Sequence, residues 1–173
     1  MADPRASNAA RLFAAGAAAS VVVLAVGLVL QHGFDKQPCA WCVLQRLVFV
    51  AIGVVCVIGA LAVRARSAQI AAALVADALA VAGAAAALYQ HFVASLSDSC
   101  GVSLADKLIV ALSLHEIAPW MFFADAPCNQ ANMPFLGVPF ALWSLAGFLF
   151  MGAGAMAALL VLLRGTPGGS ARA

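Results

Sequence analysis

The sequence predicts an all-α membrane protein, a bundle of four transmembrane helices with a short and a long loop on the same side. Hydrophobic residues make up 65% of the 173 residues and charged residues only 9%, whereas soluble domains carry about 25% charged residues. Four apolar segments are each long enough to cross a bilayer, which takes about 20 helical residues. The net charge of +2 is small and the sequence has no basic cluster, so a nucleic-acid partner is not expected.

The whole chain, residues 1–173, is treated as a single membrane domain. The first apolar segment follows Arg5 and Arg11, as the core of a signal peptide would, but its uncharged run is longer than the roughly 7–15 residues of such a core. We therefore expect it to be retained. The fourth segment is long enough to tilt or to begin in the membrane interface. The predicted spans are residues 12–30, 43–63, 70–92 and 136–163, and the segments between them are residues 31–42, 64–69 and 93–135.

The basic residues predict the orientation of the bundle. On one side of the predicted bundle lie Arg5, Arg11, Arg64, Arg66, Arg164 and Arg172, whereas the loops of the other side carry only Lys36 and Lys107. The positive-inside rule therefore predicts that both termini are cytoplasmic. In a bacterium the two loops on the other side would be periplasmic, and the protein would lie in the inner membrane.

Runs of small residues occur within the spans, at residues 71–73, 84–87 and 152–154. Small residues let helix backbones approach closely in lipid, which favours a compact bundle. The alanine preference of a GC-rich genome would give the same pattern, so both interpretations stay open here.

The long loop, residues 93–135, contains a helical pattern. Ser103 and Asp106 have the spacing of a capping box, and apolar residues follow at helical intervals, namely Leu104, Leu108, Ile109, Leu112 and Ile117. The bulky apolar run at residues 120–123 is typical of an interfacial belt. We expect an amphipathic helix lying on the outer face of the bilayer. The alternative is a loop packed on the bundle without lipid contact.

The short loop runs into the second span through Pro38-Cys39-Ala40-Trp41-Cys42-Val43-Leu44-Gln45-Arg46. If the span is helical, Cys42 lies in its first turn, where free backbone N–H groups and the helix dipole favour a thiolate over a thiol. Cys42 is therefore the predicted reactive sulfur. Arg46 follows one turn later on the same face, about 6 Å along the axis. An electron-accepting ligand between the two would meet a nucleophile and a positive charge.

The other cysteines divide into one within a span and two in the long loop. Cys56 lies in the middle of an apolar segment, and we interpret it as structural. Cys100 and Cys128 bracket the amphipathic segment, in a compartment where disulfides persist. A zinc site would need four convergent ligands, and structural disulfides would need no arginine beside the CxxC motif. Redox chemistry is therefore favoured over both, and no metal site is expected.

The sequence resembles the disulfide bond formation protein B (DsbB) family. The residues that carry the resemblance are the run 38–46, Tyr89-Gln90-His91 at the end of the third span, and Phe135-Leu136-Gly137-Val138-Pro139 with Trp143. The resemblance covers the four spans and both outer loops. It implies a quinone-linked thiol oxidase, a protein-disulfide oxidoreductase that reoxidises a soluble thioredoxin-like partner similar to DsbA. Ubiquinone or menaquinone from the membrane pool would be the electron acceptor.

The resemblance also implies a role for each site residue. The partner's thiolate would attack Cys100, and Cys128 would resolve or relay the mixed disulfide. Cys128 would then exchange with Cys39, which passes the electron pair to Cys39 and Cys42. Cys42 would donate to the quinone, and Arg46 would hold a quinone oxygen.

Three further polar residues need an interpretation. His91, at the outer end of the third span, is a candidate for lining the quinone pocket or protonating the quinol, although a histidine there is commonly an interfacial residue. His32, in the short loop, has a weaker claim. Asp77 is an intramembrane carboxylate, which is a functional hypothesis by default, but it lies far from the expected quinone edge and receives no role.

Two alternative functions stay open. A vitamin K epoxide reductase-type oxidase also places a CxxC at a helix end, but there the motif follows the loop pair, whereas here it precedes it. A non-catalytic membrane scaffold or zinc-binding protein would use the cysteines only as disulfides or ligands.

Overall fold

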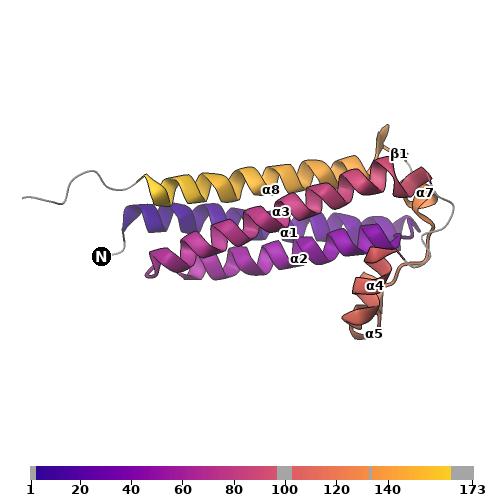
Figure 1. Ribbon diagram of the computed structural model, residues 1–173, viewed down its shortest axis with the longest axis horizontal. Helices are drawn as coiled ribbons and strands as arrows, with labels where there is room; N and C mark the ends of the chain where they lie inside the picture. Colours follow the sequence, from indigo (N-terminus) through magenta and orange to yellow (C-terminus); the bar gives the residue numbers. More distant parts are fainter. Residues whose placement is uncertain (1–2, 97–102, 133, 165–173) are drawn as a thin grey trace, which may run out of the picture.

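The structure is a computed structural model that describes residues 3–96, 103–132 and 134–164. Its four long helices are each long and apolar enough to cross a membrane. Figure 1 shows them running along one common axis. The predicted four-helix membrane bundle is confirmed, and its helices are α1 (Pro4–Gly33), α2 (Ala40–Leu61), α3 (Arg66–Phe92) and α8 (Phe140–Leu163).

The four helices form a ring of neighbours. Helix α1 packs on α2 and α8, and α3 packs on the same two helices. The loop elements α4 to α7 and the strands β1 and β2 gather at one end of this bundle (Figure 1). We call it the cysteine end, because Cys39, Cys42 and Cys128 lie there.

Three of the long helices begin earlier than predicted. Helix α1 starts at Pro4 instead of residue 12, after the Asp3 side chain accepts a hydrogen bond from the Arg5 amide at 3.0 Å. Helix α2 starts at Ala40 instead of residue 43, and α3 at Arg66 instead of residue 70. Hydropathy marks only the apolar part of a helix, whereas the helix itself continues into its polar ends.

The predicted start of the fourth span at residue 136 is wrong. Strand β1 (Pro134–Phe135) pairs antiparallel with β2 (Val138–Pro139), and the intervening Leu136 and Gly137 have φ angles of 53° and 80°. Positive φ at both central residues is typical of a tight hairpin turn. The Trp143 indole N–H donates to the Phe135 carbonyl at 3.1 Å and holds the hairpin against α8. Helix α8 therefore begins only at Phe140.

Small residues allow large aromatic rings into the bundle core. Phe148 and Phe49 are buried and stacked, with ring centroids 4.0 Å apart and an interplanar angle of 4°. A Cβ atom added at Gly83 would overlap the Phe148 ring, and one at Gly59 would lie 2.9 Å from the Phe13 ring. At these two glycines, helix packing requires the small residue, whatever the composition of the genome.

The long loop contains η1 (Ala94–Leu96), α4 (Leu104–Ala111), α5 (Leu114–Ile117), α6 (Pro119–Phe122) and α7 (Cys128–Ala131). The capping box at the start of α4 is confirmed, since the Ser103 hydroxyl accepts from the Asp106 amide and the Asp106 carboxylate accepts from the Ser103 amide. The predicted single helix is interrupted, however, because Ser113 adopts a left-handed conformation with φ 49°.

The α4–α5 segment is amphipathic and runs crosswise to the bundle axis (Figure 1). Ala105 and Ile109 are buried within the apolar cluster at the start of α2. The opposite side exposes Leu104, Val110, Leu112 and Ile117. The segment thus packs on the bundle, as in the alternative, and also keeps an exposed apolar face. Its contact with lipid stays a prediction.

Candidate active site

The first cysteine pair lies at the beginning of α2. Cys39 is the N-cap residue, and its carbonyl accepts the first helical hydrogen bond from the Val43 amide at 3.0 Å. Cys42 lies in the first turn, as predicted. The two Sγ atoms are 3.2 Å apart and share a hydrogen bond. Both residues are free thiols and both are buried.

The two sulfurs are not equivalent. The hydrogen bond with Cys42, together with burial, raises the pKa of the Cys39 thiol far above its ordinary value. Cys39 therefore keeps its proton and acts as the donor in the sulfur–sulfur hydrogen bond. Cys42 is then the acceptor, and its role as the nucleophile stays a prediction.

A buried glutamine contacts both sulfurs from α3. The Gln90 side-chain amide donates to Cys42 Sγ at 3.1 Å and approaches Cys39 Sγ at 3.7 Å. Gln45, on α2, donates in turn to Gln90 Oε1 at 2.6 Å. Both glutamines belong to the motifs that carry the family resemblance, but the sequence alone predicted no role for them. Their position in otherwise apolar spans was the available signal, because a buried amide needs hydrogen-bond partners.

Arg46 lies on the turn of α2 that follows Cys42, as predicted. Its Nη1 donates to Gln31 Oε1 at 2.5 Å and to the Met121 carbonyl at 2.9 Å. Its Nη2 donates to the Gly27 carbonyl at 3.3 Å. The side chain is only 9% exposed, so the guanidinium group is fixed between α1, α2 and α6.

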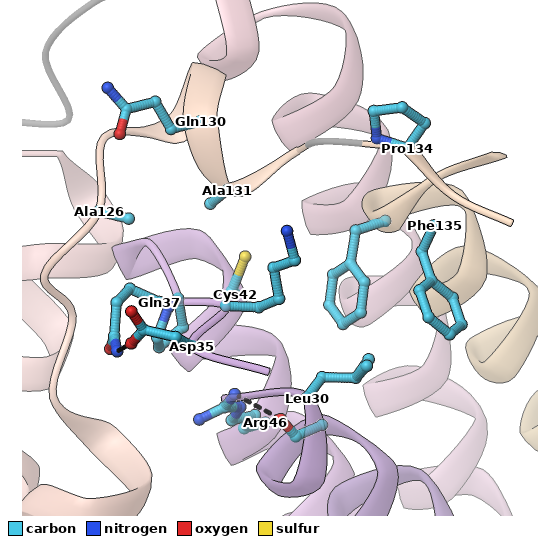
Figure 2. Close-up of a pocket in the computed structure, with 14 residues that line it drawn as sticks. Leu30, Asp35, Gln37, Cys42, Arg46, Ala126, Gln130, Ala131, Pro134 and Phe135 are labelled. Carbon is cyan, nitrogen blue, oxygen red and sulfur yellow. Dashed lines mark hydrogen bonds between the residues drawn. The ribbon is translucent and has the colours of Figure 1, made fainter. Parts of the chain in front are cut away.

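Cys42 and Arg46 border one cavity of about 250 Å³. Figure 2 shows the Cys42 side chain directed into this space, with Pro134 and Phe135 across from it. The remaining apolar lining includes Leu30 and Phe140, and the polar lining includes Asp35, Lys36, Gln37 and Gln130. A small site with apolar walls, a few polar groups and a fixed cation is suited to a ring-shaped ligand with oxygen acceptors.

The long loop brings Cys128 to the same end of the bundle. The amides of Asp125 and Ala126 donate to the Pro38 carbonyl at 3.2 and 3.3 Å, immediately before Cys39. Cys128 is fully buried and disulfide-bonded. Cys39, Cys42 and Cys56 are free. Cys100, which is predicted to react with the partner's thiolate, lies outside the described residues.

Comparison with known proteins decides the family. The family model for disulfide bond formation protein DsbB matches residues 9–159. This chain belongs to the DsbB family. It is therefore a multi-pass membrane protein of disulfide bond formation, with the disulfide oxidoreductase activity that the family implies.

Individual DsbB relatives align with most of the chain. The disulfide bond formation protein B of Herminiimonas arsenicoxydans is 31% identical, covering 82% of this chain and 89% of the relative. That of Stutzerimonas stutzeri is 31% identical, covering 88% and 94%. That of Ralstonia nicotianae is 33% identical, covering 72% and 80%. The chain matches no solved structure.

The two candidate histidines of this DsbB-family protein lie beside the cavity site, not in it. The His91 ring is 3.3 Å from the Asn132 amide nitrogen, and Asn132 Oδ1 accepts from the Ala141 amide. His91 thus connects α3 with the region before α8 and is not among the described residues that line the cavity. His32 contacts the Trp120 carbonyl through Nε2 at 2.9 Å.

Two other residues singled out by the sequence lie deeper in the bundle. Cys56 is buried in mid-span, and a Cβ atom added at Gly16 of α1 would lie 3.0 Å from its Sγ atom, as expected for a structural cysteine. Asp77 is partly buried on α3, and within the described residues its Oδ2 atom has no hydrogen-bond partner. Among those residues, too, no three His, Cys, Asp or Glu side chains are grouped to hold a metal ion.

Proposed function

We propose that this protein is a membrane thiol oxidase that reoxidises a DsbA-like dithiol partner and transfers the electrons to a membrane quinone. One observation carries the proposal: the Cys42 sulfur and the Arg46 guanidinium group border the same cavity, beside a Cys39–Cys42 dithiol. A thiol in this position could donate electrons to a quinone, and the cation could bind a quinone oxygen.

The residues of the cavity fit a quinone head group. A quinone ring is planar and apolar, and its two carbonyl oxygens accept hydrogen bonds. Arg46 is the candidate donor to one oxygen, while Leu30, Phe135 and Phe140 supply apolar walls. When bound, a quinone supplies an acceptor for two electrons and two protons.

Thiol–disulfide exchange would deliver the electron pair to Cys39 and Cys42. A partner thiolate attacks Cys100 and releases Cys128, and Cys128 then attacks the oxidised first pair at Cys39, which releases Cys42. The partner's second thiolate completes the partner disulfide and frees Cys100, and Cys100 displaces Cys39 from Cys128. The net change is one new disulfide in the partner and a reduced Cys39–Cys42 pair.

The segment before Cys128 lies against the segment before Cys39. The hydrogen bonds from the Cys128 segment to Pro38 keep the two cysteine loops adjacent, which supports direct exchange between them.

The proposal is tested with the purified full-length protein, a reduced DsbA-like partner and ubiquinone or menaquinone with a shortened tail. Loss of quinone absorbance should follow partner oxidation with equal stoichiometry. Cys42→Ser should abolish turnover, whereas Cys56→Ala should leave it unchanged. A wild-type protein that oxidises the partner without consuming either quinone would overturn the proposal.

The location of the site is a separate part of the proposal. We place the cysteine end in the periplasm of a bacterial cell and both termini in the cytoplasm, with the bundle in the inner membrane. A reporter fused to the C-terminus that is active only in the cytoplasm should be active. A reporter active only in the periplasm, fused at the same point, should be silent.

A further inference from the structure

A chain of two buried side-chain amides ends at the first cysteine pair and remains unused in the relay described above. Gln90 is 0% and Gln45 is 2% exposed. They form a chain in which Gln45 donates to Gln90 Oε1 at 2.6 Å and Gln90 donates to Cys42 Sγ at 3.1 Å. Gln45, Gln90 and Cys42 are all buried, and a hydrogen bond between buried groups is stronger than in water.

The contact between the two amides couples their orientations. Gln45 Nε2 donates to Gln90 Oε1 at 2.6 Å, and this orientation turns the Gln90 nitrogen towards Cys42, to which it donates. A sulfur anion accepts hydrogen bonds and a neutral amide N–H donates them. The pair is therefore arranged for the thiolate form of Cys42.

We infer that Gln90 is a catalytic residue that stabilises the Cys42 thiolate, and that Gln45 is a positioning residue that orients Gln90. The inference rests on the proposed function for its biological use. A donor that binds the thiolate stabilises the reduced state of the pair relative to its disulfide. It thereby makes the Cys39–Cys42 disulfide a stronger oxidant, as stabilisation of the reduced form does in strongly oxidising dithiol proteins. That favours electron flow from the reduced loop cysteines, Cys100 and Cys128, to the first pair.

The test measures the thiol–disulfide equilibrium of the first pair directly. The full-length protein is equilibrated anaerobically with glutathione buffers, without quinone or partner, and peptide mass spectrometry reports the redox state of Cys39 and Cys42 separately from the loop cysteines. Because neither quinone nor partner is present, the result stands or falls independently of the proposed function. The rate of Cys42 alkylation by iodoacetamide at neutral pH provides a second readout.

Gln90→Leu should lower the equilibrium constant for reduction of the pair about tenfold, which is about 30 mV for a two-electron couple. Cys42 alkylation should slow by a similar factor. Gln90→Met, which keeps the length of the side chain, should give the same result and replaces Gln90→Leu if that variant folds poorly. Gln45→Leu should shift both readouts in the same direction. Because Gln45 acts through Gln90, the double variant should match Gln90→Leu alone.

Gln69 provides the matched control. It is a fully buried glutamine of the same helix, and it donates to the Ala6 and Gly59 carbonyls at the opposite end of the bundle. Gln69→Leu removes buried hydrogen bonds without touching the cysteines, so both readouts should stay at wild-type values. Unchanged readouts in Gln90→Leu and Gln90→Met, or an equal shift in Gln69→Leu, would overturn the inference.

Discussion

The guanidinium group of Arg46 donates a hydrogen bond to the backbone carbonyl of Met121 at 2.9 Å. Met121 belongs to α6 in the long loop, whereas Arg46 lies one turn after Cys42 in α2. The same Nη1 atom binds Gln31 at the end of α1. A single side chain therefore joins two membrane helices and the long loop at the edge of the cavity.

Replacing Arg46 should weaken quinone binding. Arg46→Ala should raise the KM for quinone about tenfold or more, because a hydrogen bond to a charged group contributes about 1.5–3 kcal/mol and loss of ligand binding appears mainly in KM. Initial rates at varied quinone concentration measure it. Arg64→Ala, in the exposed turn at the opposite end, should leave KM unchanged. Equal KM values for Arg46→Ala and the wild type would show that Arg46 does not bind the quinone.

The two thiols should differ in reactivity. Hydrogen bonding to Cys42 and burial raise the pKa of Cys39, and a raised pKa leaves less thiolate at a given pH. Cys39 should thus stay protonated near pH 8.5, where an ordinary thiol is about half ionised. In the reduced protein, iodoacetamide should label Cys42 before Cys39, as measured by peptide mass spectrometry. Cys42→Ala removes the largest cause of the shift and should speed the labelling of Cys39, whereas equal rates in the wild type would contradict the assignment.

Gly83 should not tolerate a side chain. A Cβ at this position would overlap the ring of Phe148, and that ring is held by its stack on Phe49. Overpacking of this kind costs about 1–3 kcal/mol, so Gly83→Ala should lower the Tm of the protein in detergent. Gly154→Ala is the control, because its Cβ would meet nothing within 4 Å. Equal Tm values for the two variants would argue against the tight packing of α3 on α8.

The capping box should stabilise α4 locally. Ser103→Ala removes the hydroxyl that accepts from the Asp106 amide at 3.2 Å, and loss of an N-cap costs about 1 kcal/mol. Hydrogen exchange of the α4 amides should accelerate about fivefold, while exchange in the four long helices stays as in the wild type. Ser103→Thr keeps the acceptor and should preserve the protection. Acceleration in both variants would point to a cause other than capping.

Local patterns in the sequence were enough for the bundle and for the first cysteine pair. Apolar length predicted the spans, and the CxxC motif before an apolar run predicted Cys42 in the first turn of α2. The residues at which the helices are interrupted or begin late were harder to predict. The left-handed Ser113 and the Leu136–Gly137 turn depend on how the long loop packs on the bundle, and hydropathy is insensitive to that packing.

The sequence by itself determined that this protein crosses the membrane with four helices, and it determined where Cys42 and Arg46 lie along α2. Both results depend on single segments of the chain. The length of each apolar segment predicts a membrane span, and the helical repeat places Arg46 one turn after Cys42. Only the tertiary structure decided which groups surround them. Gln90 reaches Cys42 from α3, and Gln31 and Met121 reach Arg46 from α1 and α6. These residues are far apart in the chain, and they meet because buried polar groups find partners only where the packed helices bring them together.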